Sequence, residues 1–208
     1  MDAPANDSPD TTENTPRESW WVRGGWTGVV RRRALPIAVV AVVVAGLLVW
    51  RVEVRPDLPA FLVLGAVGTV LGAVDIASKR LPDPLTLPMY GAGAALLAVA
   101  APATEDGGAR LLYALFGLAG LWLLLAVQWV VVPDKIGLGD VKLAGVLGLY
   151  LGWVGYGAWV LGVLAMYVPS GVFAVTLLAL RRAGRKSELP FGPFMLAGAL
   201  IGILVHAG

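Results

Sequence analysis

Cysteine is absent from this 208-residue chain, histidine occurs once, at His206, and only 14% of the residues are charged. Without cysteine the chain has neither disulfides nor thiolate metal ligands. A single histidine also excludes catalysis that relies on several of them. A soluble domain carries about a quarter charged residues, so the low charge and the 58% hydrophobic content favour a membrane protein.

The positive charge of the chain does not suit nucleic acid. The formal net charge is +2, and the 16 Lys and Arg residues lie in short clusters along the sequence. A nucleic-acid-binding domain needs a continuous basic face, which these clusters cannot form. The expected environment is instead the lipid bilayer.

Residues 1–34 differ in composition from the rest of the chain. Residues 1–19 are polar and are predicted to be disordered. Three Trp residues within 20–26 then precede an Arg triplet at 31–33, a combination typical of a membrane–water interface. A signal peptide begins with its charged and apolar regions, so this segment is interpreted as a cytoplasmic tail with an interfacial end.

Long apolar runs fill the rest of the sequence and predict an all-α, polytopic membrane protein with about seven transmembrane helices. A helix needs roughly 20 residues to cross about 30 Å of hydrocarbon. The run 141–180 is too long for one crossing, and glycines within 152–157 divide it. The predicted spans are 35–50, 58–78, 84–101, 110–132, 140–153, 155–180 and 189–206, of which the first and fifth are short. An N-terminal helix and loop (35–57) therefore precede a six-helix core (58–208).

The distribution of cations predicts the orientation in the cell membrane. With the N-terminus in the cytoplasm, all but three of the 16 Lys and Arg residues fall in inside segments. The three exceptions are Arg51, Arg55 and Arg110. The positive-inside rule therefore predicts a cytoplasmic N-terminus and an outside C-terminus.

Two aspartates stand at the ends of apolar runs, where an unpaired charge is unfavourable and usually functional. Asp75 lies near the inner end of the second span, about 6 Å from Lys79 at about 1.5 Å per residue. Asp140 begins the fifth span, which starts at the same membrane face. The two carboxylates are therefore expected at one depth.

A pair of carboxylates that shares one water holds one proton near neutral pH, so one member can act as base and the other as acid. This is peptide hydrolysis without Ser, Cys or metal. Membrane aspartates also relay protons or bind cations in transporters, and depth and pairing alone favour neither function over the other.

Three segments resemble motifs of one family. Residues 137–142 (GLGDVK) resemble the GxGDxK signature of type IV prepilin peptidases and archaeal preflagellin peptidases. Residues 75–86 (DIASKRLPDPLT) resemble the family's other catalytic segment, and residues 189–194 (LPFGPF) resemble the segment that opens its last helix. The order, spacing and membrane side agree, and the resemblance covers six of the seven predicted spans.

The resemblance implies roles for particular residues and requires neither metal nor cofactor. Asp75 and Asp140 would be the catalytic pair. Gly137 and Gly139 would let the backbone near Asp140 turn tightly and approach a substrate. Lys142 would tune a carboxylate or meet a lipid phosphate, unless it is a simple positive-inside anchor. The implied supporting residues of the last segment are Pro190, Phe191, Gly192 and Pro193.

The resemblance also implies a substrate: prepilin-like proteins, whose short basic leader is cleaved on the cytoplasmic side ahead of a hydrophobic helix. Long members of the family methylate the new N-terminus and carry a Cys-rich loop. Because this chain has no Cys, it resembles the short, peptidase-only members such as those that serve Flp-type pili. A homo-oligomer is compatible with this interpretation.

Other classes fit the residues less well. A rhomboid-type serine protease needs Gly-x-Ser-Gly, but Val168 takes the place of the first Gly, and Ser170 and His206 lie at different depths. Presenilin-like proteases share GxGD but carry Pro-Ala-Leu where this chain has Pro-Phe-Gly at 190–192. A transporter would predict inverted repeats and mid-membrane polar residues. A structural pilus-assembly protein leaves both aspartates unexplained.

Overall fold

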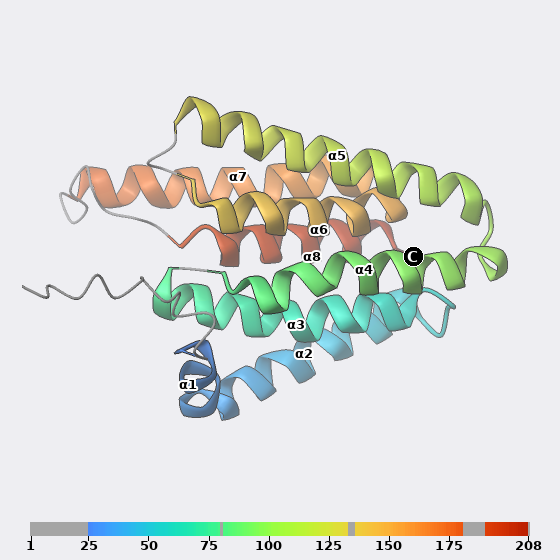
Figure 1. Cartoon of the computed structure of the whole chain (residues 1–208), viewed down its shortest axis with the longest axis horizontal. Helices are drawn as coiled ribbons and strands as arrows, with labels where there is room; N and C mark the ends of the chain where they lie inside the picture. Colours follow the sequence, from blue (N-terminus) through green and yellow to red (C-terminus); the bar gives the residue numbers. More distant parts are fainter. Residues whose placement is uncertain (1–24, 80, 133–135, 181–189, 208) are drawn as a thin grey trace, which may run out of the picture.

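The described part of the chain is a bundle of helices that run along one axis (Figure 1). The computed structural model describes residues 25–79, 81–132, 136–180 and 190–207. No strand occurs in these residues. The helices are α1 (Gly25–Arg32), α2 (Ala34–Val52), α3 (Leu58–Ser78), α4 (Asp83–Ala100), the 3₁₀ turn η1 (Ala101–Ala103), α5 (Gly107–Val131), α6 (Leu138–Val154), α7 (Tyr156–Ala179) and α8 (Gly192–His206).

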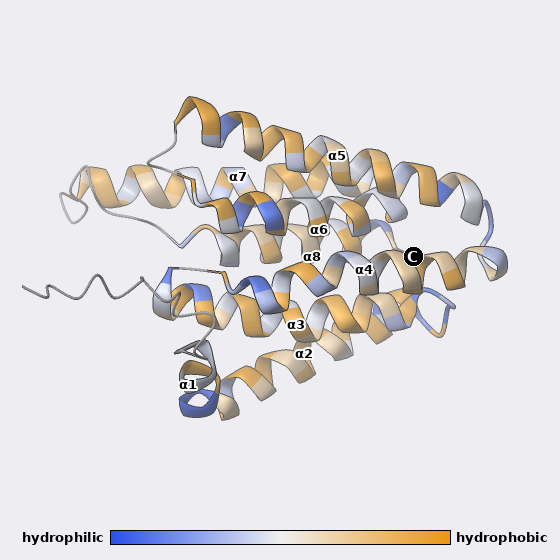
Figure 2. Ribbon diagram, in the orientation of Figure 1, coloured by the Kyte–Doolittle hydropathy of each residue, from blue (hydrophilic) through white to orange (hydrophobic). Residues whose placement is uncertain are grey.

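The predicted architecture of a polytopic helical membrane protein is confirmed. A helix stands at each of the seven predicted spans, with ends within three residues of those expected. Five described helices are long and apolar enough to cross a membrane: α2, α3, α4 with η1, α5 and α7. Apolar residues dominate their lengths (Figure 2). The first span was expected to be short, but α2 has 19 residues, and the short helices are α6 with 17 and α8 with 15.

Helix α6 is the centre of the bundle. It contacts α4, α5, α7 and α8, and every residue from Val141 to Trp153 except Lys142 is buried. A helix that is apolar on all sides is typical of such a central position. Its length is therefore set by burial among the other helices as much as by the thickness of the membrane.

Glycines allow the helices to approach α6 and each other closely. A Cβ atom on Gly148 would meet the backbone carbonyl of Gly117 in α5, and one on Gly152 would meet the carbonyl of Tyr113. A Cβ on Gly198 of α8 would lie 2.6 Å from a backbone atom of α7. The small residues spaced four apart in the sequence therefore serve close helix packing, as expected in a membrane.

The N-terminal region contains a helix that the sequence analysis does not predict. Gly25–Arg32 form α1, which contacts α2 and α3 and ends in two arginines. Residues 1–19, predicted to be disordered, lie outside the described residues.

At the opposite end of the bundle, the Arg51 side chain donates hydrogen bonds to two carbonyls in the last turn of α8, Leu204 at 2.6 Å and Val205 at 3.2 Å. Arg51 therefore closes the C-terminus of α8 and attaches α2 to it.

Candidate active site

Asp75 lies in the last turn of α3 and is almost fully buried, with 4% of its surface exposed. The helix ends at Lys79, which adopts a left-handed conformation (φ 52°) and donates its N–H to the Asp75 carbonyl. The Asp75 carboxylate accepts a hydrogen bond at 3.1 Å from the backbone N–H of Gly192. The side chain of α3 thus reaches the first residue of α8, where free N–H groups stabilise an anion.

Gly192 is the residue of the Pro-Phe-Gly-Pro segment that contacts Asp75. A Cβ atom at this position would lie 2.7 Å from the Asp75 Oδ2 atom, so no side chain fits there without moving the carboxylate. Pro193 follows in the first turn of α8, where a missing N–H is harmless. Phe191 packs against the Tyr167 ring of α7, with centroids 5.7 Å apart, and Pro190 is partly buried just before it. The segment therefore fixes the N-terminus of α8 against Asp75.

Asp140 stands in the first turn of α6 and is more exposed than Asp75. Its Oδ2 atom accepts a hydrogen bond at 3.3 Å from the N–H of Gly137, the residue that caps the helix. Gly137 has φ −77° and ψ 145°, a conformation open to any residue, so the turn itself does not require glycine. Gly139 does have a packing role, since a Cβ there would lie 3.0 Å from Leu81 in the α3–α4 loop.

The structure brings the two predicted aspartates to the same end of the bundle. Asp75 comes from the end of α3 and Asp140 from the start of α6. Each carboxylate accepts one backbone hydrogen bond from the first residues of a helix. In the described part of the chain neither one forms an ion pair with Lys or Arg. Two carboxylates so arranged have the groups needed for acid–base chemistry on a shared water.

Lys142 pairs with an aspartate at the start of α4. Its Nζ atom lies 2.8 Å from both carboxylate oxygens of Asp83, and both side chains are about one-third exposed. An Asp before Pro is typical of a helix N-cap, but here Pro82 occupies the cap position and Asp83 is the first helical residue. Tyr90 of α4 donates a hydrogen bond at 2.6 Å to the Lys142 carbonyl. These contacts join α4 to α6 beside Asp140.

No group of three or more potential metal-ligating side chains occurs in the described segments. The residues weighed for a serine protease stay within their own helices. Ser170 donates to the Tyr167 carbonyl at 3.0 Å in α7, and His206 contacts the Gly202 carbonyl at 3.3 Å in α8.

Comparison with known proteins gives the family. Residues 62–206 match the model of the type IV leader peptidase family. A prepilin leader peptidase/N-methyltransferase of Pectobacterium carotovorum is 32% identical over 209 residues, which cover 93% of this chain and 70% of that protein. Proteins with the same name from Aeromonas salmonicida and Pseudomonas aeruginosa are 31% and 26% identical.

These two alignments each cover 92% of this chain, which spans 66% of the length of both relatives. No solved structure matches the chain significantly. The family match includes Asp75, Asp140 and the Gly192 segment, which form the cluster described above. The chain is an integral membrane protein and belongs to the type IV leader peptidase family.

Proposed function

We propose that this chain is a membrane-embedded aspartic endopeptidase that removes the leader peptide of prepilin-like proteins. The observation that carries the proposal is the position of Asp75 and Asp140 at one end of the bundle, where each carboxylate accepts a backbone hydrogen bond from the residue that begins or caps another helix or its own. The names of the relatives support the leader-peptide substrate. Residues 58–208 would form the peptidase, and residues 35–57 an additional helix and loop.

The reaction needs only a water and the two carboxylates. The ionised aspartate takes a proton from the water as its oxygen attacks the scissile carbonyl, and the protonated aspartate donates a proton to the carbonyl oxygen. When the tetrahedral intermediate collapses, the C–N bond breaks and a proton passes to the leaving amine. The Gly192 and Gly137 N–H groups hold the two carboxylates in position throughout.

The proposed site lies at the cytoplasmic face. The described cations Arg31, Arg32, Arg33, Lys79 and Lys142 belong to the helix ends that surround the aspartates, whereas Arg51, Arg55 and Arg110 belong to the other end. The positive-inside rule favours this orientation.

The proposed activity is leader cleavage without methylation of the new N-terminus. The chain has no Cys, and the resemblance implies a Cys-rich loop for the family members that methylate.

Leader cleavage of a co-expressed prepilin tests the proposal. We expect the wild-type chain to shift the prepilin band on a gel, and both Asp75→Asn and Asp140→Asn to abolish the shift at equal expression. Loss of a member of a catalytic pair lowers rates by about 10³-fold or more. Cleavage by either variant would show that the pair is assigned wrongly. An inactive wild type with several prepilins would refute the substrate class.

A further inference from the structure

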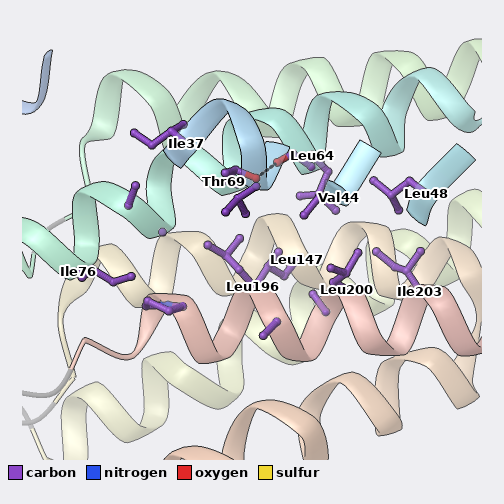
Figure 3. A pocket seen from close by; sticks show the side chains of 18 of the residues that line it. Ile37, Val44, Leu48, Leu64, Thr69, Ile76, Leu147, Leu196, Leu200 and Ile203 are labelled. Carbon is purple, nitrogen blue, oxygen red and sulfur yellow. Dashed lines mark hydrogen bonds between the residues drawn. The ribbon is translucent and has the colours of Figure 1, made fainter. Parts of the chain in front are cut away.

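An apolar groove lies between α2, α3 and α8, next to the candidate active site. Its cavity volume is about 410 Å³, and all but a small part of its lining is hydrocarbon. Figure 3 shows Leu196, Leu200 and Ile203 of α8 pointing into it, opposite Val44 and Leu48 of α2. The groove is only partly enclosed, so a ligand can enter it from outside the bundle.

Glycines of α3 line the groove. Gly65, Gly68 and Gly72 follow one another along it. A Cβ on Gly68 would lie 3.0 Å from Leu196, and one on Gly72 would lie 3.2 Å from it. Leu196 of α8 therefore lies close over α3, and larger residues at these positions would push α8 away and change the shape of the groove.

One end of the groove is cationic. Arg33, which is exposed, lines the groove at the junction of α1 and α2. In the part of the chain that the structure describes, Arg33 forms no ion pair. Ile76 and Pro193 line the same end, and each directly follows a residue of the Asp75–Gly192 contact. An anionic group at this end would therefore meet an unpaired guanidinium.

The dimensions of the groove fit one hydrocarbon chain. Its lining runs from Arg33 to Leu48 on α2 and from Pro193 to Ile203 on α8. At about 1.5 Å per residue these stretches are roughly 15–22 Å long. One leaflet of the bilayer contributes about 15 Å of hydrocarbon, half of the roughly 30 Å core. The groove therefore spans the depth of one leaflet, starting from its cationic end.

The distribution of charge in the groove favours a lipid over a partner helix. Among its described lining residues only Arg33 is charged, and Arg33 lies at one end. An anionic phospholipid likewise carries its charge at one end of apolar chains.

We propose that this groove is a binding site for one anionic phospholipid. One of its acyl chains lies in the groove between α2 and α8, and its phosphate lies at Arg33. The lipid belongs to the leaflet on the side of the candidate active site. The proposal depends on the groove and its charge, and does not depend on the peptidase activity.

Native mass spectrometry of the intact, delipidated protein tests this site. The probes are phosphatidylglycerol and phosphatidylcholine with identical acyl chains, titrated in detergent. We expect one phosphatidylglycerol to remain bound at collision energies that remove phosphatidylcholine. Because one cation near an anionic headgroup contributes about fivefold in affinity, Arg33→Gln should weaken phosphatidylglycerol binding by about that factor.

Two pairs of variants separate the site from general lipid binding. Ala197→Trp places a large ring in the groove, whereas Ala95→Trp places it on an exposed part of α4 outside the groove. Arg31→Gln removes an equal charge from a position that does not line the groove. We expect loss of the retained lipid in Ala197→Trp and near wild-type binding in both controls.

Three outcomes would overturn the proposal. The first is equal retention of the two lipids, which removes the role of Arg33. The second is retention of phosphatidylglycerol by a folded Ala197→Trp protein, which places the lipid elsewhere. The third is displacement of the lipid by an apolar helical peptide that crosslinks to cysteine introduced at Leu200, which makes the groove a helix-binding site.

Discussion

The two ends of the bundle both contain a buried aspartate, but these carboxylates have very different surroundings. At the end away from the candidate site, Asp57 is fully buried and accepts hydrogen bonds from the Trp153 indole at 2.9 Å and from the Arg55 guanidinium at 3.2 and 3.3 Å. Asp75 accepts one backbone hydrogen bond, from Gly192, and shares its end of the bundle with the second carboxylate, Asp140.

The difference separates a structural carboxylate from a reactive one. A buried charge is stable when a cation and further donors satisfy it, as at Asp57. That arrangement leaves the oxygens of Asp57 occupied and fixes the α2–α3 loop to the end of α6. No described Lys or Arg pairs with Asp75, and a second carboxyl group lies at the same end of the bundle, so folding alone gives no reason for the pair. The predictions below alter one end at a time.

Gly192→Ala should have the largest effect among changes that leave both aspartates in place. The new Cβ would lie 2.7 Å from the Asp75 Oδ2 atom and displace the carboxylate. A misplacement of about 1 Å can slow catalysis by about 100-fold, so we expect leader cleavage to slow by about 10- to 100-fold. Initial rates on a purified prepilin measure this.

Gly91→Ala is the matched control for Gly192→Ala, since a Cβ there meets nothing within 4 Å. It should cleave at the wild-type rate. An unchanged rate in Gly192→Ala itself would mean that the contact with Asp75 has no part in the reaction.

Trp153→Phe should lower stability at the opposite end and leave the chemistry intact. The change removes one of the three hydrogen bonds that the Asp57 carboxylate accepts, and a hydrogen bond to a charged group contributes about 1.5–3 kcal/mol. We expect a lower thermal midpoint in detergent and a normal cleavage rate per folded molecule. Trp122→Phe, at an exposed residue, should leave the midpoint unchanged. A Trp153→Phe protein that is as stable as the wild type would contradict the structural role of Asp57.

Breaking the Lys142–Asp83 pair should have the smallest effect. Both side chains are about one-third exposed, and such pairs contribute roughly 0.2–1 kcal/mol. Lys142→Met and Asp83→Asn should each slow cleavage only a few-fold by loosening α4 against α6. The exchanged pair Lys142→Asp with Asp83→Lys should recover most of the rate. Equal defects in the single variants and the exchanged pair would exclude a simple ion-pair role.

The sequence was sufficient to predict the helices and the end of the bundle that the two aspartates share. Each apolar run is long and bounded by polar or Gly-rich segments, so the direction of each helix follows from its order in the chain. Because α3 runs toward the face from which α6 starts, Asp75 and Asp140 had to share an end. The predicted assignment of Asp75 and Asp140 as catalytic residues stays a prediction until activity is measured.

Contacts between distant residues could not be predicted in the same way. Asp57 follows Pro56 in a short loop, and nothing local shows that Trp153 reaches it from another helix. The Asp83–Lys142 pair and the Gly192–Asp75 contact also join segments far apart in the chain. Hydropathy gives the position of a residue along the membrane normal, whereas these contacts depend on which helices are neighbours within the bundle.

The most direct test of this account compares Asp57→Asn and Asp75→Asn in the same two measurements, leader cleavage and thermal midpoint. We expect Asp75→Asn to lose cleavage and keep its midpoint, because its carboxylate serves the reaction. Asp57→Asn should lose stability by about 1–3 kcal/mol and keep its cleavage rate per folded molecule. The account is contradicted if Asp75→Asn still cleaves the leader, or if it loses cleavage only because it no longer folds.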